Sequence, residues 1–533
     1  MATVSVAEVK ADAGVSPGRA RLVIWASSLG SVFEWYDFFV YGTLAALLGG
    51  LFFPSDNPTA ALLKSLATFG AGFGVRPLGA IVFGRLGDRI GRKRTFLVTI
   101  ALMGGATVAV GLLPTYASAG VWAPVLLVIC RLAQGLALGG EFGGAAIYVA
   151  EHAPPGKRGL HTSWIQVSIT GGFLLSIGVV LGTQAVLGKA NWLAWGWRVP
   201  FLISIVMLGI SLWVRLQLHE SPVFAAMKAA GGCAKSPLRE SFATAPNRRA
   251  MFVAMIGIAA GLTVIFYTSE FYTLYFLQGA MQVDETQARI LVGLPLLAMA
   301  PFVVGFGWLS DKIGRRPITI AGYALTLVLL FPLYHQIARG ANPALAGASP
   351  RAPVVVTGQT CAFDVFAAKG QATPCARVLD YLAKHGVSYT KRSGPGLEVR
   401  MGGEALAATD AASLGAALAR AGYPAKADPG AMDRWRIMAA IFGLGVLTAS
   451  TIGAAAAVLV ELFPARIRYT SMSLPYHLAT GYFGGFLPFV TQYVVAKTGD
   501  AFAGLWYTIA VVAAALVVTI VGLPETRGRD VRR

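Results

Sequence analysis

The sequence has little charge and few of the residues that carry out most enzyme chemistry. Only 13% of its 533 residues are Asp, Glu, Lys or Arg, and it has 6 His and 4 Cys. At the same time, 56% of the residues are hydrophobic and the mean hydropathy is +0.63. This balance excludes a water-soluble monomer, so we expect most of the chain to lie in a lipid bilayer.

Signatures of ATP-driven and metal-dependent chemistry are also missing. The chain has no Gly-rich nucleotide-binding loop, which argues against a primary pump, and no His, Cys and Asp cluster at metal-ligand spacing. We therefore expect a protein that is not an enzyme and that holds no metal or cofactor.

Acidic residues are few as well, 25 against 44 basic ones. The basic residues are scattered through short loops beside apolar segments, so we do not expect nucleic-acid binding. Positive charges in alternate loops instead set the orientation of a membrane protein. They lie at 21, 89–94, 157–158, 228–249, 312–316, 466–468 and 527–529, which predicts two cytoplasmic termini.

Long apolar segments are what the sequence has in abundance. About 17 to 25 mostly apolar residues cross a bilayer, and each half of the chain has six such segments. The first has no cleavable-signal layout, because it is too long and contains Glu34 and Asp37, so we interpret it as a retained span. The twelve predicted spans are 24–48, 62–83, 96–113, 125–150, 163–187, 199–218, 251–278, 288–309, 318–337, 438–462, 471–495 and 505–523.

A short motif occurs once in each half, between two predicted spans. The copies are Gly84-Arg-Leu-Gly-Asp-Arg-Ile-Gly-Arg-Lys93 and Gly307-Trp-Leu-Ser-Asp-Lys-Ile-Gly-Arg-Arg316. An acid, a helix-breaking glycine and basic residues at the end of an apolar segment suit a short cytoplasmic loop. The repetition indicates a duplicated membrane transporter, and the motif resembles the loop signature of the major facilitator superfamily.

The spacing of a second repeated feature indicates an insertion. The loop motifs begin 223 residues apart, at 84 and 307, whereas the Glu-x-x-Pro motifs at Glu151 and Glu461 are 310 residues apart. The extra 87 residues fit only where apolar density falls, within 340–433. The span count places this insert outside the cytoplasm.

The insert has the pattern of a small α/β domain. Cys361 and Cys375 lie in it on the oxidising side, so we expect a disulfide, with two free thiols as the alternative. The domain either collects substrate, or covers the outer vestibule, or is a passenger in a tolerant loop. Its segments, strands at 354–357, 387–390 and 397–401 and helices at 375–385 and 410–421, predict the order β-α-β-β-α.

The predicted fold is an all-α membrane protein with twelve transmembrane helices in two pseudo-symmetric six-helix bundles and this α/β insert. The expected parts are an N-terminal tail (1–20), the first bundle (21–218), a cytoplasmic central loop (219–249), helices seven to nine (250–339), the insert (340–433), helices ten to twelve (434–524) and a C-terminal tail (525–533).

Charged residues inside the spans are the main functional candidates, because each costs about 3 kcal/mol or more at the bilayer centre unless it faces a cavity or a partner. In the first span Glu34 and Asp37 share a helical flank, and Tyr41, a substrate-binding candidate, follows one turn later. Either acid is a proton-coupling candidate; the alternative is that it only pairs with an arginine on another helix.

The fourth span carries Arg131 and Gln134 on one face, both substrate-binding candidates, and also contains Glu141, a further proton-coupling candidate. A buried guanidinium favours a carboxylate partner. We expect that partner to be Asp37, Glu34 or an anionic substrate.

Four more candidates lie in other spans. Arg76 is an intramembrane cation of the second span, and Arg198, at the outer mouth of the sixth, either contacts substrate or only snorkels at the interface. Glu270 lies among tyrosines that include Tyr272, and His477 lies early in the eleventh span. Glu270 is interpreted as a proton site and Tyr272 and His477 as substrate contacts, with helix-packing hydrogen bonds as the alternative.

Several motifs together resemble the metabolite:proton symporter branch of the major facilitator superfamily, over nearly all of the chain except the insert. They are Glu34-Trp-Tyr-Asp-Phe, Arg76-Pro, the loop 84–93, Arg131-x-x-Gln-Gly with Gly140-Glu141, Trp195-Gly-Trp-Arg-x-Pro-Phe and Phe463-Pro-x-x-Ile-Arg-Tyr. That branch includes carriers for α-ketoglutarate, citrate, shikimate and proline or betaine. The resemblance implies proton-driven uptake of a small organic-acid or zwitterionic metabolite across a bacterial inner membrane, and we expect a monomer.

The same resemblance implies a cytoplasmic gate at the two loop motifs and alternating access about a midplane site. A proton on Asp37 or Glu34 would release an arginine to bind the substrate carboxylate. The gate candidates are Gly84, Asp88, Gly91, Arg92, Asp311, Gly314 and Arg315.

Two alternatives use the same scaffold. An exporter or antiporter is disfavoured because intramembrane arginines suit acids better than a greasy drug pocket. A transporter-like sensor would need a cytoplasmic effector, and 219–249 and 525–533 are too short to fold into one.

Overall fold

The computed structural model describes residues 17–90, 92–140, 142–216, 237–359, 361–367 and 370–529. Within these ranges the side chains at 17–27, 84–94, 96, 142 and 214–215 are not described.

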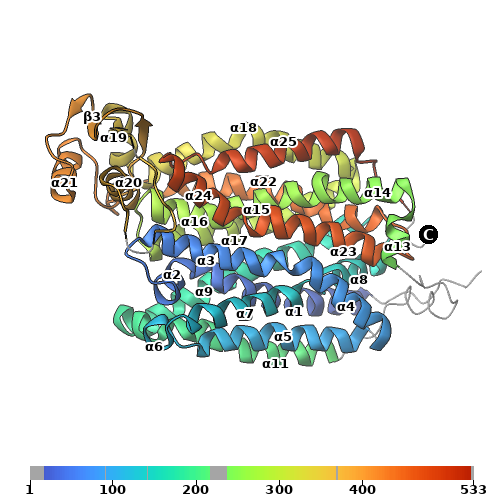
Figure 1. Ribbon diagram of the computed structural model, residues 1–533. Coiled ribbons are helices and arrows are strands. Elements are labelled where there is room, and N and C mark those ends of the chain that lie inside the picture. The colour runs from blue at the N-terminus through green and yellow to red at the C-terminus, as the bar shows by residue number, and fades with distance from the viewer. Residues whose placement is uncertain are drawn as a thin grey trace, which may run out of the picture.

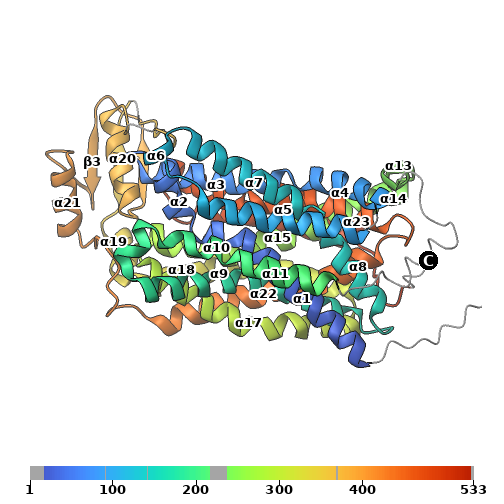
Figure 2. The ribbon, with the colours of Figure 1, turned by 90° about the horizontal axis from the view of Figure 1, so that it is seen from below.

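The helices of the two halves of the chain form two layers, and the insert lies at one end of both (Figure 1). Helix α1 begins at the opposite end, where the C-terminus also lies, as the view from below shows (Figure 2). The elements of the first half are α1 (Pro17–Thr43), α2 (Ala45–Phe52), α3 (Pro58–Gly74), α4 (Arg76–Ile90), α5 (Arg92–Leu112), α6 (Tyr116–Ala119), α7 (Trp122–Leu138), α8 (Phe142–His152), α9 (Arg158–Ala194), η1 (Gly196–Arg198), α10 (Val199–Leu202) and α11 (Ser204–Leu216).

The second half contains several π-helical segments, whose i→i+5 hydrogen bonds widen the helix. Its elements are α13 (Pro237–Ala243), α14 (Ala245–Phe252), η2 (Val253–Ala260), α15 (Gly261–Tyr267), η3 (Thr268–Tyr272), α16 (Thr273–Tyr275), η4 (Phe276–Ala280), α17 (Glu285–Ile313), α18 (Arg315–Ala341), α22 (Arg434–Glu461), α23 (Arg468–Ala479), η5 (Thr480–Gly485), α24 (Leu487–Thr498) and α25 (Leu505–Gly522).

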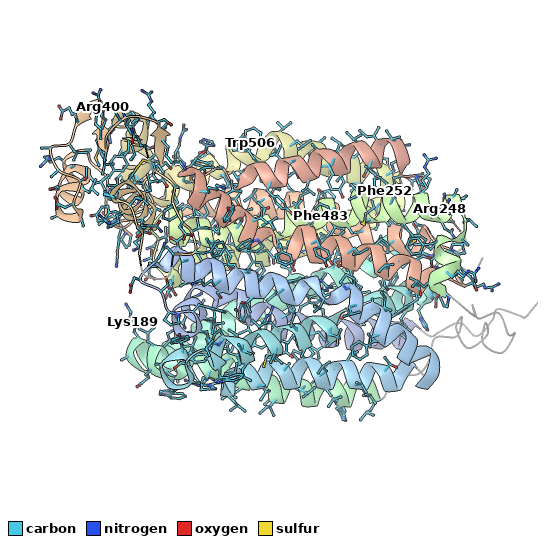
Figure 3. All side chains as sticks on the ribbon, in the orientation of Figure 1. Lys189, Arg248, Phe252, Arg400, Phe483 and Trp506 are labelled. Atoms are coloured by element: carbon cyan, nitrogen blue, oxygen red, sulfur yellow. A yellow bond between two sulfur atoms is a disulfide. The ribbon has the colours of Figure 1, made fainter. Side chains whose placement is uncertain are left out.

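In the described part of the chain, 9 helices are long and apolar enough to cross a membrane, or 10 if Ser28–Thr43 and Ala45–Phe52, bent by 61°, form one span. The two other predicted spans correspond to the shorter apolar helix Leu97–Leu112 and to the stretch from α23 to α24, which η5 interrupts. Between the charged ends of the molecule, marked by Arg400 and Arg248, apolar side chains such as Phe252 (52% exposed) and Trp506 (62%) point outward, as lipid-facing residues do (Figure 3).

Three predicted boundaries were wrong. The first helix begins at Pro17, inside the predicted tail, and helix α18 continues to Ala341, two residues into the predicted insert. The predicted central loop 219–249 contains α13 and the start of α14. Thr244 caps α14 by accepting a hydrogen bond from Asn247 N, and Pro246 suits its first turn, so this segment forms a helix in spite of its charge.

The insert is a four-stranded sheet with helices, and it has one strand more than the sequence predicted. The strand order is β2-β1-β3-β4, with β1 parallel to β2 and antiparallel to β3. A disulfide joins Cys361 to Cys375. The elements are α19 (Pro343–Arg351), β1 (Val354–Thr357), α20 (Pro374–Lys384), β2 (Tyr389–Arg392), β3 (Glu398–Met401), β4 (Glu404–Ala405) and α21 (Ala411–Arg420).

Glycine allows the closest helix contact in the first bundle. Gly135 of α7 lies against the backbone of Gly72 in α3, and a Cβ at Gly135 would overlap the Gly72 carbonyl oxygen. Because backbone on both sides forms this contact, no side-chain rotation can make room.

We expect Gly135→Ala to lower stability by about 2 to 3 kcal/mol, since the helices must move apart. The apparent melting temperature of the purified protein should fall by several degrees. Gly105→Ala is the matched control: no atom lies within 4 Å of its added Cβ, so its stability should be unchanged or slightly raised. Equal melting temperatures for the two variants would contradict this account.

Candidate functional site

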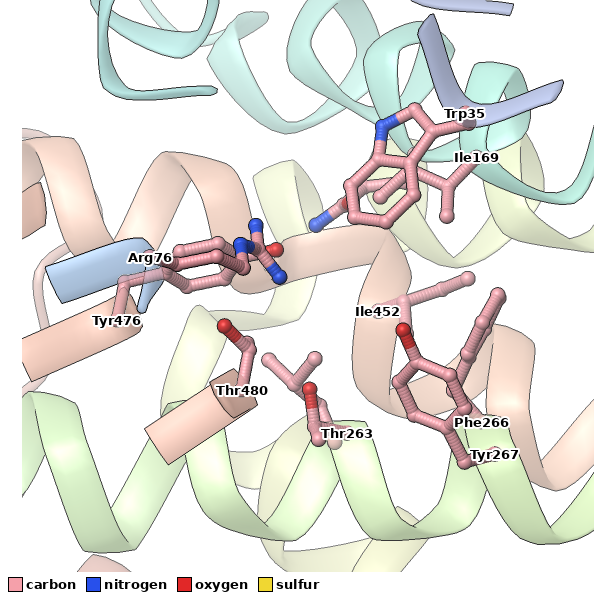
Figure 4. A pocket seen from close by; sticks show the side chains of 11 residues that line it. Trp35, Arg76, Ile169, Thr263, Phe266, Tyr267, Ile452, Tyr476 and Thr480 are labelled. Atoms are coloured by element: carbon pink, nitrogen blue, oxygen red, sulfur yellow. The ribbon is translucent and has the colours of Figure 1, made fainter. Parts of the chain in front are cut away.

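A small cavity lies between the two bundles, near the middle of the helical stretch Ala245–Ala280 (Figure 4). The volume open to the centre of a water molecule is about 20 Å³, enough for one water. It is too small for a metabolite, so the bundles pack closely around it in this structure. It is lined by Trp35, Arg76, Gln166, Ile169, Leu262, Thr263, Phe266, Tyr267, Ile452, Tyr476 and Thr480.

Among the described residues, Arg76 supplies the only arginine group that lines this cavity, and it is fully buried. It lies over the rings of Trp35, at 5.4 Å, and Phe73, at 5.1 Å. None of its three nitrogens has a hydrogen-bond partner among the described residues. Helix α3 ends just before Arg76 and Pro77 follows it, so the sequence breaks the helix where the cation must face the cavity.

Further unpartnered polar groups surround the cavity. Gln166 Nε2 and Thr480 Oγ1 are buried and have no hydrogen-bond partner in the described structure. His477 is also fully buried with both ring nitrogens unpartnered, and it lies close enough to Arg76 for an electrostatic interaction. The site therefore has one fixed cation and several groups able to donate hydrogen bonds, as a small carboxylate-bearing molecule requires.

The predicted pairing of Arg131 with a first-span carboxylate was wrong. Arg131 Nη1 donates to Gln134 Oε1 at 2.6 Å, and the guanidinium lies 4.1 Å from the ring centroid of Phe38. Asp37 instead accepts a hydrogen bond from Ser204, on α11. Adjacent helical residues point about 100° apart, so α1 presents Phe38 to Arg131 and turns Asp37 away.

The other candidates of the first bundle have mostly structural contacts. Glu34 is buried. Tyr41 bonds to Ser65, and its ring lies 4.4 Å from the Arg131 guanidinium. Arg198 is half-buried over Trp197 and donates to a backbone carbonyl at 3.4 Å. In this structure neither Tyr41 nor Arg198 lines the cavity.

Glu270 is fully buried in the π-helical segment η3, and neither carboxylate oxygen has a hydrogen-bond partner among the described residues. Thr170 of α9 lies beside it, but its hydroxyl also makes no hydrogen bond of normal geometry. Glu270 is one turn past Tyr267 of the cavity wall. Tyr272, by contrast, donates to the backbone of Ala501 at 3.0 Å, so its role is structural here.

Aromatic rings from both bundles close the cavity on the side of the insert. The Phe271 ring centroid lies 5.4 Å from that of Phe39 and 5.6 Å from that of Phe69. One turn further, the Tyr275 hydroxyl donates to the Gly42 carbonyl at 2.7 Å, across the bundle boundary.

Charged groups close the opposite end. Asp311 of α17 accepts hydrogen bonds from the first-turn amides of α9, Gly159 N at 2.9 Å and Leu160 N at 2.8 Å. Arg315 Nη1 lies 2.7 Å from Asp311. Gly314, between the two helices, has φ 107°, a value that favours glycine. The second loop motif thus joins the two bundles.

Two reciprocal ion pairs cross the same boundary. Glu151 of the first bundle pairs with Arg468 of the second at 3.2 Å, and Glu461 of the second lies 3.7 Å from Arg158 of the first. Both pairs are related by the duplication, since 151 and 461, like 158 and 468, are 310 residues apart. Glu461 also bonds Arg315 at 3.2 Å.

The C-terminal segment packs against the start of α18, at the end opposite the insert. Burial raises the pKa of Glu525, but hydrogen bonds from the backbone amides of Arg315, Arg527 and Arg316 outweigh it, so the pKa lies below its usual value. Glu525 therefore caps the first turn of α18 as an anion.

Some predicted residues lie outside the description. Glu141 and Gly91 are among the residues not described, and Gly84, Asp88 and Arg92 have undescribed side chains, so the first copy of the gate stays a prediction. Within the described residues no group of three or more His, Cys, Asp or Glu could hold a metal ion.

The sequence reasoning missed several residues that the structure places at the cavity or the gate. Gln166, an amide in the middle of an apolar span, was a signal for the cavity. The 310-residue offset had already linked Glu151 to Glu461, and continuing it would have found Arg158 and Arg468.

These features, apolar helices in two layers around a closed central cavity, define a membrane transporter. A family model described as "Sugar (and other) transporter" matches residues 22–250. The shikimate transporter of Escherichia coli is 37% identical and the alignment covers 60% of this chain and 73% of the relative. The α-ketoglutarate permease of E. coli is 35% identical over 63% of this chain and 77% of the relative.

The proline/betaine transporter of Salmonella typhimurium is 36% identical, and the alignment spans 60% of this chain and 65% of that protein's length. Among solved structures, a D-xylose-proton symporter has a TM-score of 0.60 at 16% identity, covering 96% of this chain and 99% of that one. The E. coli xylose transporter in a partially occluded inward-open conformation has a TM-score of 0.59, also at 16% identity, with the same coverage of both chains. The chain belongs to the major facilitator superfamily, among its metabolite transporters.

Proposed function

We propose that this protein imports a small carboxylate-bearing metabolite together with protons, by alternating access of two six-helix bundles. The observation that carries the proposal is the buried Arg76 guanidinium, which faces the central cavity and has no hydrogen-bond partner among the described residues. A charge in such a place is costly unless a ligand neutralises it. The names of the relatives, for shikimate, α-ketoglutarate and proline/betaine, agree with a ligand that has a carboxylate.

The proposed topology has twelve spans, with both termini in the cytoplasm of a bacterium and the insert outside its inner membrane. Basic loops at the end opposite the insert support this orientation. The Cys361–Cys375 disulfide supports an oxidising compartment for the insert. We propose that the monomer is the transport unit, because the cavity is complete within one chain.

Glu270 is the proposed proton carrier, in place of Asp37 and Glu34. A buried carboxylate with no donor favours its neutral form, so this residue must hold a proton when the cavity is closed. The cavity has room for one water in this structure, so it must widen to admit a substrate. The substrate-loaded cavity then closes most favourably with the substrate carboxylate on Arg76 and a proton on Glu270, because both charges are neutralised. The need for a neutral closed state thus couples proton movement to substrate movement.

Glu270→Gln should therefore abolish accumulation driven by an acid gradient but preserve exchange of labelled for unlabelled substrate, because glutamine mimics the protonated acid. Both activities are measured in proteoliposomes. Glu398→Gln, in an exposed pair with Arg400 on the insert, is the control and should behave as wild type. Gradient-driven accumulation by the Glu270 variant would refute its role as the carrier.

The ligand can be identified by thermal stabilisation of the purified protein. The panel is α-ketoglutarate, citrate, shikimate, benzoate-type acids and proline betaine. One carboxylate should raise the melting temperature of the wild type, by mass action, and not that of Arg76→Gln. If none of them stabilises the wild type, the carboxylate proposal is wrong.

A further inference from the structure

The insert is attached very unequally to the two bundles. On the second bundle, backbone hydrogen bonds join Tyr389 N to Gly499 O at 3.0 Å and Ala427 N to Gln282 O at 3.1 Å. Gly386 packs directly on the Ala280 backbone, where a Cβ would overlap it. Backbone contacts of this kind cannot be broken by a side-chain rotation.

Aromatic stacking extends this attachment toward the bundle boundary. Phe366, which follows the disulfide-bonded Cys361, stacks on two rings of α24, with centroid distances of 6.2 Å to Phe489 and 6.4 Å to Tyr493. The disulfide ties this segment to the first turn of α20. The insert is therefore one body with the second bundle.

On the first bundle, side-chain hydrogen bonds of the described residues join the insert to the loop between α2 and α3. The Ser55 hydroxyl donates to Ala367 O at 3.3 Å, and Lys384 Nζ donates to Asp56 O at 3.2 Å. Each is made by a single side chain that can turn away. The insert thus bridges the two bundles at its own end of the molecule, the end that the aromatic rings close.

We propose that the insert is a latch on this end: it moves with the second bundle, and its two bonds to the α2–α3 loop hold the end closed until the bundles separate. The proposal rests on the alternating access proposed above. It gives the insert a part in the transport cycle, because the strength of the latch sets how often this end opens.

Spin-label distances in lipid test the latch, in a Cys130→Ser, Cys233→Ser background that keeps the disulfide. Exposed positions supply three pairs of labels: Pro58→Cys with Thr286→Cys between the bundles, Pro58→Cys with Glu404→Cys from first bundle to insert, and Thr286→Cys with Glu404→Cys from second bundle to insert. We expect two distances, a shorter and a longer one, for both pairs that include Pro58→Cys. The pair from second bundle to insert should show a single distance.

Removing the latch bonds with Ser55→Ala and Lys384→Met should raise the population of the longer distance about threefold to tenfold, as expected for the loss of one or two hydrogen bonds. Lys391→Met is the matched control, since Lys391 Nζ makes the same kind of bond, at 2.5 Å, to Lys497 O of the second bundle. Asp380→Asn removes the ion-pair partner of Lys384 without removing the bond to Asp56. Neither control should change the populations.

If the bundles separate while the distance from insert to first bundle stays fixed, the latch is refuted and the transport mechanism stands. The same holds if Ser55→Ala with Lys384→Met leaves the populations unchanged. If the distance between the bundles never changes, with or without the carboxylate panel, alternating access fails and the latch with it.

Discussion

Arg76→Gln should abolish substrate uptake and at the same time make the substrate-free protein more stable. Hydrogen bonds to a charged group contribute about 1.5 to 3 kcal/mol each, so losing the pair that a guanidinium makes to a carboxylate lowers affinity by about 100-fold or more. Stability should rise, because the variant no longer buries a cation that has no hydrogen-bond partner and no carboxylate partner among the described residues. The two readouts are initial uptake rate and apparent melting temperature.

The two effects together separate a binding role from a structural one. A structural arginine, once removed, would lower uptake and stability alike. Arg76→Lys keeps the charge but not the planar fork, so we expect partial uptake. Arg249→Gln, at an exposed arginine that bonds the Val521 carbonyl, is the control and should leave both readouts unchanged. Wild-type uptake by Arg76→Gln would contradict the proposed site.

Glu461→Gln should reduce uptake at least tenfold by preventing the end opposite the insert from closing. Glu461 is buried and contacts Arg315 at 3.2 Å and Arg158, on the other bundle, at 3.7 Å. Breaking a buried ion pair from one side costs about 3 to 5 kcal/mol, because the remaining charges are left unpaired. If only part of that cost falls on the state in which this end is closed, the ratio of closed to open molecules falls by a factor of ten or more.

The duplication supplies a second test of this gate. Glu151→Gln removes the symmetry-related pair with Arg468 and should have a similar effect on uptake. Glu240→Gln is the control, because its pair with Arg466 is largely exposed and such pairs contribute about 1 kcal/mol or less. If Glu461→Gln transports within twofold of wild type while Glu240→Gln does not, the gate has been assigned to the wrong residues.

Much of the fold follows from local properties of the sequence. Apolar length predicts where spans lie, and the repeated loop motif predicts the duplication. The prediction was poorer where helices break. Helix seven contains π-helical turns at η2, η3 and η4, and these depend on packing against neighbouring helices rather than on residue type. Helix α14, in the predicted central loop, was missed for a different reason: its local signals, the Thr244 cap and Pro246 in the first turn, were readable from the sequence but were outweighed by the charge of the segment.

The sequence could predict which charged residues lie inside the spans, but not which side chains they contact. Intramembrane charge singled out Arg76 and Glu270, whose charged groups have no hydrogen-bond partner among the described residues, and their roles in binding substrate and proton stay predictions. The first-span carboxylate expected as the partner of Arg131 was wrong, because a helical pattern gives the face of each residue but not the rotation of one helix against another, while an anionic substrate as its partner stays a prediction. Phe38 rather than Asp37 faces Arg131, and only the packed bundle determines that.

The central claim is gradient-driven uptake of a carboxylate, and proteoliposomes test it most directly. Labelled members of the carboxylate panel are offered to vesicles containing the wild-type protein, with and without an inward acid gradient. The account predicts that one compound accumulates above equilibrium only when the gradient is present. Equilibration to the same level in both conditions, or uptake of none of the compounds, would contradict it.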